Sequence, residues 1–389
     1  MRILYCTDTF LPEVNGVTTV LETMRSGLRS RGHQVSVAAP RYDRPAPDES
    51  EVRRLAALPC PGYPQVRLSW PWGRSLQGEF DRFAPDLVHV VTEGPLGVFG
   101  RSYALRRRLP MVSSFHTDFP RYAERYLGRF AVGPTRRWLR WFHQAARLTQ
   151  TPSEATRQEL LSLGIAHATV WGRGVDTSWF RPARRSESRR AALGAAGRTL
   201  VLHVGRLAVE KGVDTLVAAF RRAHEVLGDE ALFCVAGDGP RAAPVRGALP
   251  FAVHRGFLDR GTLADLYADA DLFVFPSPTE TCGLVALEAL ASGVPVIGAA
   301  AGGIPESLRQ GLTGFLVPPG DAGGFAEGIV QLVRDGSQRA AMHEAARAFA
   351  VGRDWSRELD ELEAAYGSAR WAKTPAAAPS SWPTSTSVA

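Results

Sequence analysis

Apolar and polar positions along this chain repeat in the order strand, loop, helix and strand. Short apolar runs predict strands at residues 2–5, 32–39, 86–91, 111–116 and 168–170 of the first half. A polar loop at 7–16 and a helix at 17–30 separate the first two strands. Continuously apolar strands that alternate with helices are typical of a parallel sheet covered by helices on both faces. Right-handed crossovers between such strands give a doubly wound α/β domain.

The same order starts again after residue 197. A segment rich in Arg, Ser and Ala at 180–197 precedes the apolar run 199–205. Further strands are predicted at 231–236, 251–255, 272–275 and 294–297, and helices over 321–370. We therefore expect two domains, at 1–178 and 179–354, which a chain of 389 residues with 45% apolar content can support. Residues 371–389 are mostly Ala, Pro, Ser and Thr without periodicity, so we expect a disordered tail.

Cysteine usage and hydropathy limit the class of protein. The four cysteines, at 6, 60, 234 and 282, have no paired or metal-like spacing, which predicts reduced thiols in a cytoplasm. The chain starts directly on an apolar strand, so we expect no signal peptide. It has no apolar run of about eighteen residues, so we expect no transmembrane helix.

Positive charge is concentrated in the first half of the chain, although the net charge of the whole is only +7. Residues 101–147 hold eleven Arg and two acidic residues, interleaved with aromatic side chains. This combination suits an anionic surface that also offers apolar contacts, such as membrane headgroups or nucleic acid. The predicted surface comprises Arg106, Arg107, Arg108, Arg136, Arg137, Trp138, Arg140 and Trp141. A solvated basic helix is the alternative, and no recognised nucleic-acid fold pattern accompanies the charge.

Two segments of the second half carry the chemistry of a nucleotide-sugar site. Lys211 is one of only two Lys among 46 basic residues, which suggests a position that requires a compact ammonium group. With Arg206 it follows a predicted strand, where both can neutralise a diphosphate. Glu280 and Glu288 stand before and inside a predicted helix that Gly283 opens, and their carboxylates can accept hydrogen bonds from sugar and ribose hydroxyls. The leucines around Glu288 indicate that its carboxylate needs a partner.

The first half offers two further candidates. Gly16, in Asn15-Gly16-Val17, stands where a backbone amide can approach a phosphate at the start of a helix. An ordinary turn into a helix fits the same residues. His116 ends a predicted strand and can contact the sugar or the reacting centre, or it can be a satisfied strand-end histidine. We interpret His203, at the end of another strand, as structural.

Two other motifs point to different chemistry but match it poorly. Asp269-Ala270-Asp271 has the spacing of a metal-binding Asp-x-Asp, but its place at a helix end favours capping. Gly237-Asp238-Gly239-Pro240 lacks the third glycine of a dinucleotide loop. The chain has no nucleotide-triphosphate loop of the Gly-x-x-x-x-Gly-Lys type. Hydride transfer and triphosphate hydrolysis are therefore disfavoured.

Taken together, these motifs resemble those of glycosyltransferase family four, the retaining, metal-independent group with the GT-B fold. The resemblance covers residue 1 to about 370. The segments that carry it are Thr9-Phe10-Leu11-Pro12, Asn15-Gly16-Val17, Phe115-His116-Thr117, Gly174-Val175-Asp176, Gly205-Arg206-Leu207, Glu210-Lys211-Gly212, Gly237-Asp238-Gly239-Pro240, Phe275-Pro276-Ser277 and Glu280 to Glu288. The resemblance implies two facing Rossmann-like domains with a cleft between them, and a C-terminal helix at about 355–370 that crosses back to the first domain.

The resemblance also implies residue roles and a mechanism. It implies Gly16, Arg206 and Lys211 on the diphosphate, Glu288 on the ribose, Glu280 on the transferred sugar, His116 near the reacting carbon, and Gly256 and Phe257 around the base. The implied reaction is front-face transfer with retention, in which the departing phosphate helps to deprotonate the acceptor. No cofactor, metal or enzymic nucleophile is expected.

Two segments narrow the resemblance within the family. Residues 91–97 and 114–119 are most similar to those of actinobacterial GDP-mannose-dependent alpha-mannosyltransferases that act on lipid or lipid-linked acceptors. This implies a hexosyltransferase that makes a glycolipid or a phosphatidylinositol mannoside while bound peripherally to the inner face of the cell membrane. Relatives that use UDP-glucose, UDP-N-acetylglucosamine or UDP-sulfoquinovose, with lipid or small soluble acceptors, share nearly all these motifs. The choice between guanine and uracil donors therefore stays open.

Overall fold

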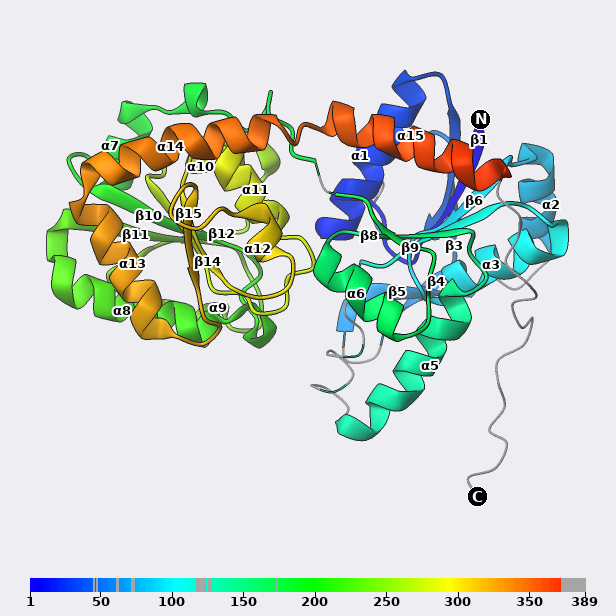
Figure 1. Ribbon diagram of the computed structural model, residues 1–389, viewed down its shortest axis with the longest axis horizontal. Helices are drawn as coiled ribbons and strands as arrows, with labels where there is room; N and C mark the ends of the chain where they lie inside the picture. Colours follow the sequence, from blue (N-terminus) through cyan, green and yellow to red (C-terminus); the bar gives the residue numbers. More distant parts are fainter. Residues whose placement is uncertain are drawn as a thin grey trace. The chain divides into compact units, whose positions relative to one another are not determined.

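The computed structural model divides the chain into two compact units, each built on its own parallel sheet (Figure 1). Unit 1 contains Met1–Gly172 and the chain from Glu358 onward, and unit 2 contains residues 173–357. The structure describes residues 1–44, 46, 48–60, 63–70, 74–116, 120, 124, 128–172 and 174–371. The boundary after Gly172 falls a few residues before the predicted one at 178. Apart from Trp371, the tail predicted at 371–389 lies outside the described residues.

Unit 1 has a seven-stranded sheet in the order β3-β2-β1-β6-β7-β8-β9, in which all neighbouring pairs are parallel. Its strands are β1 (Arg2–Cys6), β2 (Gln34–Pro40), β3 (Val52–Leu55), β6 (Leu87–Val90), β7 (Met111–Ser114), β8 (Leu148–Thr151) and β9 (Ala168–Val170). A separate antiparallel pair consists of β4 (Ala57–Cys60) and β5 (Tyr63–Ser69). The sequence did not predict β3, β8 or this pair, because short half-polar strands lack a clear periodic signal.

The helices of unit 1 are α1 (Gly16–Ser30), α2 (Arg74–Phe83), α3 (Pro95–Arg107), α5 (Val132–His143), α6 (Glu154–Ser162) and α15 (Trp355–Trp371), with a 3-10 turn at Arg129–Ala131. Alternate strand residues face opposite sides of the sheet. Leu4, Cys6 and Val90 pack on one face with side chains of α2, α3 and α5. On the other face, Tyr5 contacts Tyr366 of α15. Both faces of the sheet are therefore covered.

The C-terminal helix α15 is held on unit 1 by a buried chain of hydrogen bonds. The hydroxyl of Tyr366 lies 2.6 Å from Nδ1 of His89 and 3.1 Å from the hydroxyl of Tyr5. Nε2 of His89 lies 2.7 Å from Oγ of Ser114. Burial raises the pKa of both tyrosines well above its ordinary value, so their hydroxyls stay protonated. Polar groups of three different strands therefore hold α15 on unit 1. The resemblance had implied that the C-terminal helix returns to the first domain.

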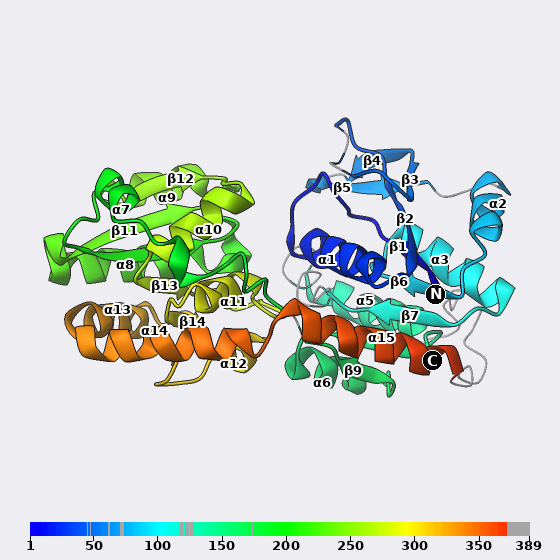
Figure 2. The ribbon, with the colours of Figure 1, turned by 90° about the horizontal axis from the view of Figure 1, so that it is seen from above.

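Unit 2 has a six-stranded parallel sheet in the order β12-β11-β10-β13-β14-β15. Its strands are β10 (Thr199–Val204), β11 (Ala231–Ala236), β12 (Val253–Gly256), β13 (Leu272–Phe275), β14 (Val296–Ala299) and β15 (Gly314–Val317). Its helices are α7 (Glu187–Leu193), α8 (Val213–Leu227), α9 (Ala242–Ala248), α10 (Arg260–Asp269), α11 (Leu284–Ala291), α12 (Ile304–Ser307), α13 (Ala322–Arg334) and α14 (Gly336–Val351), with 3-10 turns at Pro182–Arg184, Val209–Lys211 and Gly228–Glu230. Helices lie on both sides of this sheet (Figure 2). Only β15 among its strands was not predicted.

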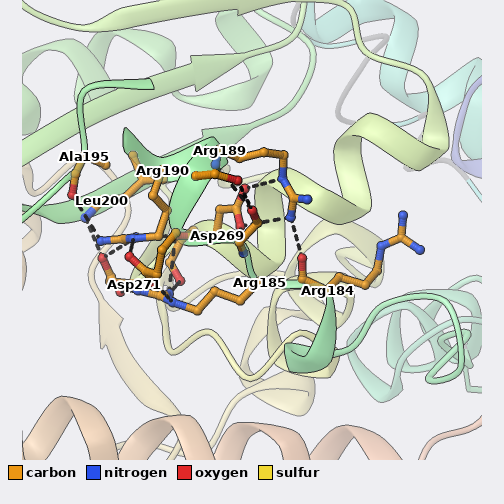
Figure 3. Close-up of polar contacts among 12 residues, drawn as sticks. Arg184, Arg185, Arg189, Arg190, Ala195, Leu200, Asp269 and Asp271 are labelled. Atoms are coloured by element: carbon orange, nitrogen blue, oxygen red, sulfur yellow. Dashed lines mark hydrogen bonds and ion pairs between the residues drawn. The ribbon is translucent and has the colours of Figure 1, made fainter. Parts of the chain in front are cut away.

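An arginine–aspartate cluster binds residues 185–190 to the end of α10 (Figure 3). Nε of Arg189 lies 2.8 Å from Asp269, and Arg185 and Arg190 lie 2.9 and 3.0 Å from Asp271. Asp271 also accepts a 2.7 Å hydrogen bond from the backbone amide of Leu200. The prediction that these aspartates cap a helix end is therefore wrong. Their oxygens are bound to arginines and to backbone amides of other segments.

The hydrogen-bond chain under α15 makes a prediction about stability. Tyr366→Phe keeps the buried ring but leaves His89 and Tyr5 without their shared partner, and we expect a loss of about 1–3 kcal/mol. Ser368→Ala, on the exposed side of the same helix, should change stability by about 0.5 kcal/mol or less. The unfolding midpoint in denaturant measures both variants. Equal midpoints for Tyr366→Phe and wild type would contradict the assignment.

Candidate active site

The strand order of unit 2 brings the predicted donor-binding loops together. β10 pairs with β11 on one side and with β13 on the other. In a parallel sheet, ligands bind at the carboxyl ends of the strands, where the order of the strands reverses. The loop after β10 carries Arg206 and Lys211, and the loop after β13 carries Glu280. The two loops therefore leave the sheet from neighbouring strands.

Lys211 and Glu280 meet in an ion pair. Nζ of Lys211 contacts Oε1 of Glu280, and Oγ of Ser277 donates a 3.1 Å hydrogen bond to the same oxygen. The side chains of Lys211 and Glu280 are 23% and 15% exposed, so the pair is accessible but partly desolvated. A basic and an acidic group, which the sequence assigned to a phosphate and a sugar, thus lie in contact.

Arg206 has a different acidic neighbour, which the sequence analysis missed. Its Nη1 lies 3.8 Å from Oε1 of Glu210, whose side chain is almost fully buried. The carbonyl oxygen of Glu210 also accepts a 2.9 Å hydrogen bond from Thr279. Glu210 therefore orients Arg206 and links the loop after β10 to the loop after β13. The spacing of four residues between Arg206 and Glu210 was the sequence signal that could have indicated this contact.

Glycines allow the backbones at this edge to approach closely. Gly212 has a φ of 69°, and a Cβ there would overlap the carbonyl oxygen of Pro276. Gly302, with a φ of 57°, lies against the carbonyl of Glu280, which accepts a 2.8 Å hydrogen bond from the amide of Gly303. A side chain at either glycine would push the loops apart. The loop after β14 therefore packs against the backbone of Glu280 and binds its carbonyl oxygen.

Glu288 lies inside α11, as predicted, and its carboxyl is in an unusual environment. Burial raises its pKa to about 7, while the Tyr267 hydroxyl and the charge of Arg260 act to lower that pKa. Tyr267 comes from α10, so its proximity could not be read from the spacing around Glu288. A carboxyl with a pKa near neutrality can accept hydrogen bonds from a diol when ionised.

The remaining predicted residues of unit 2 lie at the same edge of the sheet. Gly256 ends β12 with a φ of 62°, and its carbonyl accepts a 2.7 Å hydrogen bond from Gly237. Phe257, directly after it, is 68% exposed, which suits stacking on a planar group. His203 is fully buried, with Nδ1 2.9 Å from the carbonyl oxygen of Val274. This burial and this contact agree with the structural interpretation of His203.

In unit 1, the predicted site residues Gly16 and His116 lie at the carboxyl edge of the first sheet. Gly16 is the first residue of α1, and Asn15 caps that helix by accepting 3.0 Å hydrogen bonds from the amides of Val17 and Thr18. His116 is half-buried and follows β7. β1 and β7 each pair with β6, so Gly16 and His116 leave the same edge two strands apart.

The predicted basic and aromatic surface divides into two groups. Arg106, Arg107 and Arg108 are exposed at the end of α3, which leads to the start of β7 and hence to the amino edge of the sheet. Arg107 pairs there with Asp81. This group lies at the edge opposite to Gly16 and His116.

The second group lies on α5, where Arg136, Arg137 and Arg140 are exposed and Trp138 is half-buried. The prediction that Trp141 belongs to the surface is wrong. This ring is buried, and the guanidinium of Arg101 lies 3.9 Å above it. On a regular helix, Trp141 faces the core although its neighbour Arg140 faces solvent. The number of charges in the segment did not indicate which face each residue occupies.

Comparisons with known proteins identify the family of the chain. The model of Glycosyltransferase Family 4 matches residues 14–179, and that of Glycosyl transferases group 1 matches residues 185–349. The chain belongs to glycosyltransferase family 4. The predicted family is therefore confirmed, and the protein is an enzyme of the glycosyltransferase class.

Individual family members match nearly the whole enzyme. A GDP-mannose-dependent alpha-mannosyltransferase of Mycobacterium tuberculosis is 34% identical over 97% of this chain and 99% of its own length. A sulfoquinovosyl transferase of Arabidopsis thaliana is 34% identical over 92% of this chain and 72% of its own length. Sucrose-phosphate synthase from Thermosynechococcus elongatus superposes with a TM-score of 0.78 at 20% identity, covering 94% of this chain and 98% of that one. The predicted GT-B fold is confirmed.

Among the described residues, no group of three or more His, Cys, Asp or Glu side chains is placed to hold a metal ion. In that same part of the chain, no helix combines the length and apolar character that crossing a membrane requires.

The raised pKa of Glu288 predicts a pH dependence of stability. Its pKa rises from an ordinary 4.5 to about 7, so the folded enzyme retains this proton longer than the unfolded chain. Stability from this group therefore falls as pH rises from 4.5 to about 7, by on the order of 3 kcal/mol at most. Glu288→Gln removes the charge, so its midpoint should exceed that of wild type by more at pH 8 than at pH 5. Thermal unfolding at both pH values measures the difference, and a constant difference would refute the environment assigned to Glu288.

Proposed function

We propose that the enzyme is a retaining mannosyltransferase that moves mannose from GDP-mannose to a lipid or lipid-linked acceptor. One observation carries this proposal. At the carboxyl edge of the second sheet, Arg206 lies near the carboxylate of Glu210, and Lys211 contacts the carboxylate of Glu280. The similarity to GDP-mannose-dependent alpha-mannosyltransferases over nearly the full chain supports the choice of donor.

Each proposed role follows from the chemistry of the donor. Arg206 and Lys211 stabilise the negative charge that develops on the departing diphosphate, and the amide of Gly16 adds a hydrogen-bond donor. Glu288 accepts hydrogen bonds from the ribose, Glu280 accepts them from the mannose, and Phe257 and Gly256 contact the base. His116 contacts the sugar near its transferring carbon.

The proposed reaction needs no enzymic nucleophile, cofactor or metal. The bond between the sugar C1 and the phosphate oxygen breaks, and a bond forms between C1 and the acceptor oxygen on the same face. The acceptor proton passes to an oxygen of the leaving diphosphate. Positive side chains around that diphosphate stabilise it as it departs.

The proposed location is the inner face of the cell membrane, with α5 as the contact. Arg136, Arg137 and Arg140 project from one helix, and Phe130 just before it is 81% exposed. Arginines beside an exposed aromatic ring suit an anionic lipid interface. The group on α3 is less suitable because Arg107 is already paired with Asp81.

A second donor is supported by one specific similarity. The sulfoquinovosyl transferase is as identical to this enzyme, at 34%, as the mannosyltransferase is. We therefore keep a UDP-sugar-dependent transferase, with a lipid or small soluble acceptor, as the alternative function.

The donor site predicts selective loss of transfer. We expect Lys211→Ala and Glu288→Ala to reduce mannose transfer from GDP-mannose by about a hundredfold or more. Arg221→Ala, on the exposed side of α8, should keep wild-type turnover. Radiolabelled transfer to a lipid extract measures turnover, and circular dichroism checks the fold. Wild-type turnover by either site variant would refute the assignment, whereas transfer from UDP-glucose alone would support the alternative donor.

The membrane surface predicts vesicle binding that depends on charge. Replacing Arg136, Arg137 and Arg140 by Gln should weaken binding to phosphatidylglycerol vesicles at low salt by about a hundredfold, since each basic residue contributes about 1 kcal/mol. A control variant with Arg221, Arg222 and Arg246 of unit 2 replaced by Gln makes the same change in charge. Vesicle flotation measures both. Equal binding by the two variants would contradict a contact through α5.

A further inference from the structure

The contact between Lys211 and Glu280 limits what either group can bind. A carboxylate oxygen offers about two lone-pair positions. Oε1 of Glu280 already accepts hydrogen bonds from Nζ of Lys211 and from Oγ of Ser277. Both positions on this oxygen are therefore occupied, and only Oε2 can accept a hydroxyl proton. This contact therefore blocks a bidentate arrangement, in which each oxygen accepts a hydrogen bond from one of two adjacent hydroxyls of a hexose.

Lys211 can leave this contact without any movement of the backbone. Its ammonium group stands on a flexible four-carbon stem, and its side chain is 23% exposed. The backbones on either side are tied together, because the carbonyl of Glu210 accepts a hydrogen bond from Thr279. A change of side-chain rotamer is thus the available movement.

Arg206 is less able to make such an exchange. Its guanidinium lies near the buried carboxylate of Glu210, four residues along the same loop. A buried carboxylate left without a cation is costly, so Arg206 is expected to keep this neighbour. Glu280, the partner of Lys211, can bind substrate hydroxyls in place of the ammonium group. Of the two cations at this edge, Lys211 is therefore the one that can leave its partner.

We propose that Lys211 and Glu280 form an exchange pair that makes sugar recognition depend on the diphosphate. When a diphosphate binds, Lys211 moves from Glu280 to the phosphate oxygens, and Glu280 then offers both of its oxygens to adjacent hydroxyls of the sugar. This inference rests on the proposed function, because it assigns phosphate to Lys211 and sugar to Glu280. Its consequence is specificity for an intact nucleotide sugar, since a free sugar cannot displace the ammonium group.

The exchange predicts an unusual effect of one conservative variant. Glu280→Gln removes the charge that holds Lys211, so a bare nucleoside diphosphate no longer has to compete for it. We expect GDP or UDP, whichever binds wild type, to bind Glu280→Gln about tenfold more tightly. The matching nucleotide sugar should gain nothing or bind more weakly, because the amide replaces one of the two accepting oxygens. Isothermal titration of the full chain measures both dissociation constants.

Two controls separate exchange from a general change in charge. Asp214→Asn removes an exposed negative charge two residues after Gly212, where Asp214 pairs with Arg241 rather than with Lys211. It should leave the affinity for the nucleoside diphosphate within about twofold of wild type. In a Lys211→Met background, adding Glu280→Gln should produce no tightening.

The outcomes distinguish this inference from the proposed function. Tightening by Glu280→Gln that disappears with Lys211→Met supports the exchange. Equal tightening in both backgrounds, or no tightening at all, overturns the exchange and leaves the donor site standing. If neither GDP nor UDP binds wild type at millimolar concentration, the proposed function fails, and the exchange fails with it.

Discussion

Because β10 pairs with β11 on one side and β13 on the other, the loops that follow β10 and β13 leave the second sheet at neighbouring points. Backbone hydrogen bonds of a parallel sheet impose this arrangement, whatever side chains the loops carry. It places Lys211 against Glu280 although 69 positions separate them in the sequence. It also allows Thr279 to bind the carbonyl of Glu210. The arrangement of the proposed donor site is thus a consequence of strand order first and of side-chain chemistry second.

Partnered polar groups serve two different purposes in this enzyme. The cluster around Asp269 and Asp271 fastens residues 185–190 to the end of α10, and the hydrogen-bond chain around Tyr366 fastens α15 to the first sheet. The carboxylates of Asp269 and Asp271 and the hydroxyl of Tyr366 are largely buried and each binds more than one partner, so separating them would leave uncompensated charges or hydroxyls. The pair of Lys211 and Glu280 is partly exposed, and solvent or a substrate can replace either partner.

Sequence patterns predicted much of the fold and the composition of the site. The apolar runs located most of the strands, and Gly283 correctly indicated the start of α11. The strands β3 and β8 escaped prediction because polar residues make up half or more of each, whereas β13, which is equally short, is a continuous apolar run. β15, which begins with a glycine, was also not predicted. Trp141 was placed on the surface because charge density describes a segment rather than the face of a helix. Asp269 and Asp271 were assigned to capping because their arginine partners lie about eighty positions away in the sequence.

The sequence by itself determined the repeated strand and helix order, the two-domain plan, the family, and the residue types that suit a nucleotide sugar. These features depend on local periodicity and on short motifs, which a single chain carries in full. Only the tertiary structure decided which groups meet: Tyr267 beside Glu288, Glu210 beside Arg206, and Lys211 in contact with Glu280. Contacts of this kind depend on which strands pair and on how far loops and side chains extend from them. Those distances are set by packing in three dimensions, because the energy of a buried or half-buried charge depends on its neighbours in space.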